Sequence, residues 1–185
     1  LAYVMGGRYF DRDKYLFRRA YTIDTWDFAY TAGQHDWLQF QIDDKTFWGY
    51  FHGDNSGYYE AFHYMSYWYG MFGDEIRSAK WRDRAMKLRK SLNSICFNGS
   101  FYTHFVKLTP VTIDGVDESS QLSLSNPAAI NRGAATPHIA ASIINEYMKR
   151  RETTSAFAEW FSIDPPFPSG IFGDYKLSGG AYCNG

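Results

Sequence analysis

Two acidic residues of this sequence are candidates for general acid–base chemistry, and Asp54 is the first. It lies in the string FHGDNSGYY, close to His52 and Tyr59. Aromatic neighbours exclude water from a carboxyl group and favour its uncharged form, so Asp54 is the candidate general acid. An Asp just before a helix is also a common N-cap, a role that favours the charged form. Asn55 or Ser56 could cap the helix instead and leave Asp54 available for catalysis.

The second candidate is Glu118, which follows Asp117 in a serine-rich stretch. Adjacent carboxylates in such a loop suit a general base that activates water, or a group that binds hydroxyls. A solvated loop carboxylate explains Glu118 about as well. A base located beyond residue 185 is a further alternative.

The string YTIDTWDFAY places Asp24 and Asp27 on either side of Trp26. A Trp ring can stack on the apolar face of a sugar while carboxylates accept hydrogen bonds from its hydroxyls. Core packing of Trp26 and helix capping by Asp24 are the alternative. The other candidates for substrate contact are Trp48, His52, Tyr59, Glu60, Asn126 and Arg132, the last of which could equally clamp a carboxylate of the protein.

The composition is compatible with a carbohydrate ligand, although an aromatic-rich core explains it as well, and it argues against several other partners. Aromatic residues make up 19% of the chain, and their rings combine an apolar face with a polar edge. The formal net charge of −1 argues against a surface that follows nucleic-acid phosphates. No apolar run approaches about 18 residues, so we expect no membrane span. The five histidines are scattered without zinc-site spacing, so we expect no metal and no cofactor.

The two cysteines, Cys96 and Cys183, have neither metal-site nor disulfide-framework spacing. We therefore expect Cys96 to be a free, buried thiol. Both ends of the chain read as cuts through a longer protein, and no signal peptide is visible. A cytoplasmic or periplasmic location is favoured.

Periodicity in the middle of the chain predicts a helical hairpin. Apolar residues at helical spacing indicate a helix over 56–72, with N-cap oxygens at 54–56 and a stop at Gly73. Asp74 is expected to cap a second helix. The residues of that helix expected to face inward are Ile76, Ala79, Ala85, Leu88, Leu92 and Ile95.

The rest of the chain shows shorter or weaker patterns. Thr136 and Pro137 form an N-cap followed by a proline at the first helical position, which predicts a helix ending near Arg151. The other expected elements are a helical piece over 26–34, a short strand within 101–107, a loop over 109–126, and helices over 127–132 and 156–161. Helical hairpins separated by long loops predict an all-α fold, a partial (α/α)6 toroid with a short β excursion.

Four strings resemble the six-hairpin glycoside hydrolases, the clan of processing α-glucosidases, trehalases and glucoamylase-like enzymes. FHGDNSGYYEAFHYM is similar to the loop-to-helix element that carries the general acid in several of them. GVDESSQLSLSNPAAINRG is similar to an acidic active-site loop followed by a barrel helix. EWFSIDPPFPSGIFG and GGAYCNG are similar to the loop that precedes an N-G-x-(F/W)-P motif in these barrels. The resemblance implies that residues 1–185 are an incomplete catalytic (α/α)6-barrel domain whose remainder lies outside this chain.

The resemblance also implies an inverting hydrolase that acts on a glucoside or a related oligosaccharide with two carboxyl groups. The sequence departs from the processing-glucosidase pattern where Gly57 and Tyr58 stand in place of the usual Arg. An epimerase or polysaccharide lyase of the same barrel type remains an alternative, since His52 and His63 could form a proton-transfer pair. A non-catalytic carbohydrate-binding protein is the other alternative.

Overall fold

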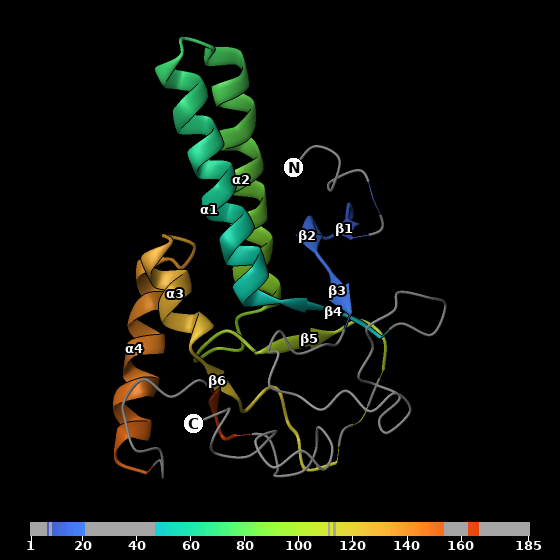
Figure 1. Cartoon of the computed structure of the whole chain (residues 1–185). Helices are drawn as coiled ribbons and strands as arrows, with labels where there is room; N and C mark the ends of the chain where they lie inside the picture. Colours follow the sequence, from blue (N-terminus) through green and yellow to red (C-terminus); the bar gives the residue numbers. More distant parts are fainter. Residues whose placement is uncertain are drawn as a thin grey trace, which may run out of the picture.

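The computed structural model describes residues 7, 9–20, 47–110, 112, 114–153 and 163–166. This part of the chain forms a long helical hairpin, a second pair of helices and small antiparallel sheets at the foot of the hairpin (Figure 1). The helices are α1 His52–Met71, α2 Glu75–Ile95, α3 Ser125–Asn131 and α4 Pro137–Arg151. The strands are β1 Phe10–Asp11, β2 Leu16–Phe17, β3 Arg19–Ala20, β4 Trp48–Phe51, β5 Phe105–Lys107, β6 Leu122–Ser123 and β7 Ile163–Asp164.

The predicted hairpin is confirmed in α1 and α2, whose buried residues recur at the alternating three- and four-residue spacing of paired helices. Near its free end the contact between the helices is small and polar. Ser66 Oγ donates to the carbonyl of Ser78, and Ser78 Oγ donates to the carbonyl of Ser66, both at 2.9 Å. Gly73 adopts φ 77° in the turn, and Asp74 accepts a hydrogen bond from the backbone N–H of Arg77. The expected stop and cap are therefore correct.

The start of α1 differs from the prediction. The helix begins at His52 with Phe51 in the N-cap position, so Asp54 and Asn55 lie inside its first turn rather than before it. Asn55 is fully buried and binds the backbone of Phe17 through both of its polar atoms, at 2.8 and 2.9 Å. The Asn55 side chain therefore joins the first turn of α1 to β2 and does not cap the helix.

The predicted all-α fold, a partial (α/α)6 toroid, is wrong because the described residues form a mixed α/β structure. β3, β4 and β5 make a three-stranded antiparallel sheet in that order, and β1–β2 and β6–β7 form two further antiparallel pairs. These strands have two to four residues. Such lengths are too short for the alternation of apolar and polar residues to reveal a strand. The short strand predicted within 101–107 is confirmed as β5. Its partner β4 is distant in sequence, as is β7 from β6, so local patterns could not show how these strands pair.

The expected inward face of α2 is partly wrong. Ile76 is 85% exposed and Ala79 is also exposed, whereas Ser78 and Trp81 are buried. Ala85, Leu88 and Leu92 are buried as predicted. The error arises because the close approach of the two helices at Ser66 and Ser78 selects small residues there.

The second half of the described chain places α3 and α4 beside the foot of the hairpin (Figure 1). Thr136 accepts a hydrogen bond from the N–H of Ile139, which confirms the predicted N-cap of α4. Arg150, near the end of α4, donates to the carbonyl of Ser120 and pairs with Asp164 of β7. The helices expected over 26–34 and 156–161 lie outside the described residues. None of the four helices carries an apolar stretch long enough to span a bilayer.

Candidate functional site

One face of the β3–β4–β5 sheet brings two basic side chains into register. Arg19 is directly opposite Gly49, and Gly49 is directly opposite Lys107. Directly opposed residues point to the same side of an antiparallel sheet, so Arg19 and Lys107 share a face with their Cα atoms roughly 10 Å apart. Each cation holds one of the two candidate catalytic carboxylates. We call this the Arg19–Lys107 face.

Asp54 projects from the first turn of α1 to Arg19. Its two carboxylate oxygens lie 3.2 and 3.4 Å from Nη1 of Arg19, and its side chain is 38% exposed. A guanidinium at this distance favours the ionised carboxylate. Asp54 is therefore better placed to accept a proton than to donate one, which is the opposite of the role expected from sequence.

Glu118 lies at the other edge of the same face. Its Oε1 is 3.1 Å from Nζ of Lys107, and the Glu118 side chain is 7% exposed. Its backbone carbonyl accepts a hydrogen bond from the N–H of His104. Glu118 is thus a buried, ion-paired carboxylate and not a solvated loop residue.

Aromatic rings occupy the space between the two ion pairs. Phe51 and Phe105 are opposed residues with ring centroids 4.5 Å apart, and the guanidinium of Arg19 lies 4.7 Å from the Phe51 ring centroid. A Cβ atom on Gly49 would fall 2.0 Å from the Phe105 ring. Gly49 is therefore what allows the Phe105 ring to lie flat across the sheet, between the two basic residues.

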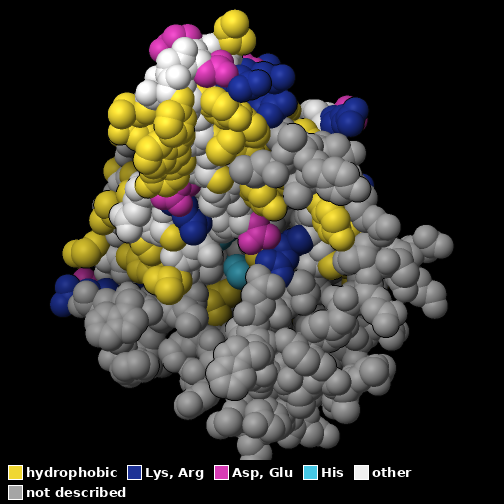
Figure 2. Space-filling view, turned by 45° about the horizontal axis from the view of Figure 1, so that its top comes forward, with side chains coloured by type: hydrophobic (Ala, Val, Ile, Leu, Met, Phe, Trp, Pro, Cys, Tyr) yellow, Lys and Arg dark blue, Asp and Glu magenta, His cyan; other side chains and the backbone are white. Residues whose placement is uncertain are grey.

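His52 and His104 lie beside this face. Nδ1 of His52 is 3.0 Å from the carbonyl of Thr103, and its ring stacks on Tyr102 at 5.5 Å between centroids. Burial lowers the pKa of His52 to about 4, and burial together with the nearby His52 lowers the pKa of His104 to about 3. Both rings are therefore neutral near pH 7. Figure 2 shows a histidine with acidic and basic side chains around it in a hollow below the hairpin.

Asn126 and Arg132 hold the surrounding backbone in place. Asn126 is fully buried and binds both the N–H and the carbonyl of Tyr102. Arg132 donates to the carbonyl of Gly53 and to Ser56 Oγ, and its Nε lies 3.4 Å from Glu60. Of the two roles considered for Arg132, these contacts match the clamp on a protein carboxylate.

The structure separates other predicted residues from this face. Trp48 is one residue from Gly49 along β4, so its side chain points to the opposite side of the sheet, where Arg18 lies 5.0 Å from its ring. Tyr59 is part of the hydrophobic core. His63 is exposed and lies eleven residues after His52 on the same helix, roughly 16 Å along its axis. Asp24, Trp26 and Asp27 lie outside the described residues.

Sequence reasoning missed several residues of the site. Arg19 lies in a segment without periodicity and Lys107 at the end of the strand predicted within 101–107, and only the strand register shows that they are neighbours. Gln121 and Ser123 are buried polar residues of the segment after Glu118. No periodic signal could have found them, because β6 is only two residues long and Leu122 between them is buried as well.

No family model, curated protein or solved structure shows significant similarity to this chain. Within the described ranges, no three His, Cys, Asp or Glu side chains come together as a metal site would require.

Proposed function

We propose that this protein is a glycoside hydrolase in which Asp54 and Glu118 are the two carboxyl groups. The observation that carries the proposal is that both are held by cations on one face of one sheet, Arg19 for Asp54 and Lys107 for Glu118. The Cα atoms of these cations are separated by two strand spacings, roughly 10 Å. An inverting enzyme holds its two carboxyl groups about 6.5–9.5 Å apart to admit a water molecule, and carboxylates held by cations two strands apart can reach such a separation.

The two carboxyl groups have environments that suit different roles. Asp54 is partly exposed and faces an arginine, which stays charged at any working pH, so Asp54 is the base that activates water. Glu118 is buried beside Lys107. As the second carboxyl group of the pair, Glu118 is assigned to protonate the leaving oxygen. This assignment reverses the roles expected from sequence.

The first test is the substitution Asp54→Asn, assayed by release of reducing sugar from a panel of α- and β-glucosides. Loss of the general base is expected to lower kcat by about 10²–10⁴-fold and to remove the acidic limb of the pH–rate profile. Glu118→Gln is expected to remove the alkaline limb instead. NMR of the first product formed should show inversion at the anomeric carbon.

The matched control is Asp83→Asn, which removes an exposed carboxylate that pairs with Lys87 on α2. This variant should keep the activity of the wild-type protein. Full activity of Asp54→Asn, or equal losses in Asp54→Asn and Asp83→Asn, would show that Asp54 is not catalytic.

A carbohydrate-binding protein without catalysis is the second candidate, and it is favoured by one observation. Both carboxylates are already engaged by cations, as in sites that bind hydroxyls without transferring a proton. Binding of a sugar by the wild-type protein without turnover would select this candidate.

A further inference from the structure

Three buried polar side chains near the Arg19–Lys107 face each leave one atom without a hydrogen bond. The atoms are Nε2 of His52, Oε1 of Gln121 and Oγ of Ser123, none of which has a hydrogen-bond partner among the described residues. The three residues are 1%, 1% and 3% exposed. Buried polar groups in folded proteins are nearly always paired, so three such atoms in one region indicate a polar ligand or ordered water.

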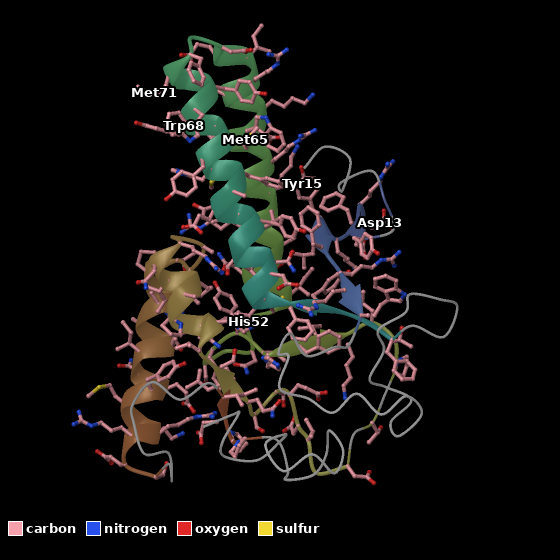
Figure 3. All side chains as sticks on the ribbon, viewed as in Figure 1. Asp13, Tyr15, His52, Met65, Trp68 and Met71 are labelled. Atoms are coloured by element: carbon pink, nitrogen blue, oxygen red, sulfur yellow. The ribbon has the colours of Figure 1, made fainter. Side chains whose placement is uncertain are left out.

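His52 and Ser123 lie beside one short segment, Tyr102–His104. His52 stacks on Tyr102 and contacts the carbonyl of Thr103. Asn126 donates to the carbonyls of both Tyr102 and Ser123, which brings β6 against the same segment. Gln121 comes directly before β6, two residues from Ser123. Figure 3 shows His52 at the foot of α1, where α1 meets the strands.

The chemistry of the three atoms selects one kind of ligand. Since Nδ1 of His52 faces a carbonyl and must carry the proton, Nε2 of the neutral ring is an acceptor. The amide nitrogen of Gln121 donates to the carbonyl of Pro165 at 3.4 Å, which leaves Oε1 as an acceptor. Ser123 can donate or accept. The group is rich in acceptors, so it needs a ligand with several donors.

Polyhydroxylated ligands satisfy this requirement and anions do not. Each sugar hydroxyl can donate one hydrogen bond and accept others. Phosphates and carboxylates offer only acceptors when ionised, and the nearby Arg19 and Lys107 are already paired with Asp54 and Glu118. Glu118 also connects these side chains to the Arg19–Lys107 face, because its backbone carbonyl accepts a hydrogen bond from the N–H of His104.

We propose that His52, Gln121 and Ser123 form the subsite that binds the hydroxyl groups of the sugar, adjacent to Glu118. The proposal rests on the glycoside hydrolase function and names residues that give it specificity. Because the three atoms are shut off from solvent, the surrounding chain must open for the sugar to reach them. Association is therefore expected to be slower than for a preformed open site.

Stability and affinity should respond in opposite directions when these atoms are removed. Ser123→Ala deletes a buried polar atom that has no partner, so the melting temperature should stay the same or rise. Gln121→Met deletes one such atom together with the 3.4 Å hydrogen bond to Pro165, so its melting temperature should change little. Each variant also loses a hydrogen bond to the ligand, so sugar affinity should fall about tenfold. A residue with a merely structural role would not combine these two effects.

The experiment measures binding rather than turnover, by isothermal titration of wild type, Ser123→Ala and Gln121→Met, each also carrying Asp54→Asn to prevent hydrolysis. The probes are D-glucose, maltose, trehalose and cellobiose at up to about 10 mM, with inorganic phosphate as the counter-probe. Ser66→Ala is the matched control, since Ser66 is a buried serine whose hydroxyl is hydrogen-bonded to Ser78. It should lower the melting temperature and leave sugar binding unchanged.

Three results would overturn the proposal: sugar affinity unchanged in both variants, no sugar bound by the wild-type background, or phosphate bound in competition with sugar. Should Ser123→Ala fail to fold, Gln121→Met carries the test. Sugar binding that depends on these residues in a protein without hydrolytic activity would refute the hydrolase function and leave the subsite standing. Hydrolysis with unaltered affinity in both variants would refute the subsite only.

Discussion

At the scale of single residues, the buried histidines connect the site to the stability of the protein. His52 and His104 are packed where a charged imidazolium would be costly, and their pKa values fall to about 4 and about 3. An unfolded histidine has a pKa near 6.5. Between these values the unfolded chain binds more protons than the folded one, so the free energy of unfolding decreases as the pH falls through this window.

We therefore expect the protein to be fully stable above about pH 6.5 and to lose stability progressively between about pH 6.5 and pH 4. A shift of the His52 pKa to about 4 corresponds to roughly 3 kcal/mol from this residue. Urea unfolding at several pH values would measure the loss, and His52→Gln should flatten its pH dependence. His138→Gln, at an exposed position of α4, is the control and should leave the profile unchanged. Equal stability at pH 7 and pH 5 would contradict the prediction.

At the scale of elements, the site depends on the three-stranded sheet and on the helix that follows β4. The sheet sets the spacing of Arg19 and Lys107, and α1 starts directly after β4, which directs Asp54 to Arg19. Asn55 fixes the first turn of α1 to β2. Strand register therefore sets the separation of Arg19 and Lys107, the start of α1 sets the approach of Asp54 to Arg19, and Glu118 reaches Lys107 from the turn before β6.

Gly49→Ala is expected to disturb this register, because its Cβ would fall 2.0 Å from the buried Phe105 ring. Overpacking of this kind costs about 1–3 kcal/mol, which thermal or urea unfolding would detect. Phe105→Leu should be destabilising by itself but should relieve the clash in the double variant, giving a favourable coupling energy. Additive effects of the two substitutions would show that the ring does not lie over Gly49.

At the scale of the whole molecule, the free end of the hairpin has its large side chains outside and its small ones inside. The exposed set comprises Tyr64, Tyr67, Trp68, Met71, Phe72 and Ile76, and Figure 2 shows apolar side chains covering this end. The interior contact is the Ser66–Ser78 pair. Large exposed apolar side chains that gather in one region often mark a surface that contacts another molecule.

Replacing Trp68 and Phe72 by Gln and Ser should reduce this surface without weakening the fold. Both side chains are more than half exposed, so the free energy of unfolding should change by less than about 0.5 kcal/mol. Fluorescence of the hydrophobic dye anilinonaphthalene sulfonate should fall clearly. Lys80→Gln, on the exposed side of α2, is the control and should not affect dye binding. A large drop in stability would show that these rings are packed in solution.

The sequence predicted the helices well because the information that specifies them is local. Apolar residues at helical spacing, the Asp74 and Thr136 caps and the Gly73 turn all act within a few residues, and each is found as expected. The same reasoning failed for Ile76, because burial there depends on how closely the neighbouring helix approaches. It also failed for the role of Asp54, because Arg19 lies 35 residues away.

What the sequence determined by itself is the αα-hairpin, the start of α4 and the two carboxyl residues on which the functional proposal depends. Only the tertiary structure decided that short strands join Arg19, Gly49 and Lys107 into one face, and that His52 and Ser123 lie beside Tyr102–His104. The physical reason is the distance along the sequence over which each kind of hydrogen bond acts. A helix forms its hydrogen bonds within four residues, whereas a sheet pairs segments whose separation leaves no periodic trace in the chain.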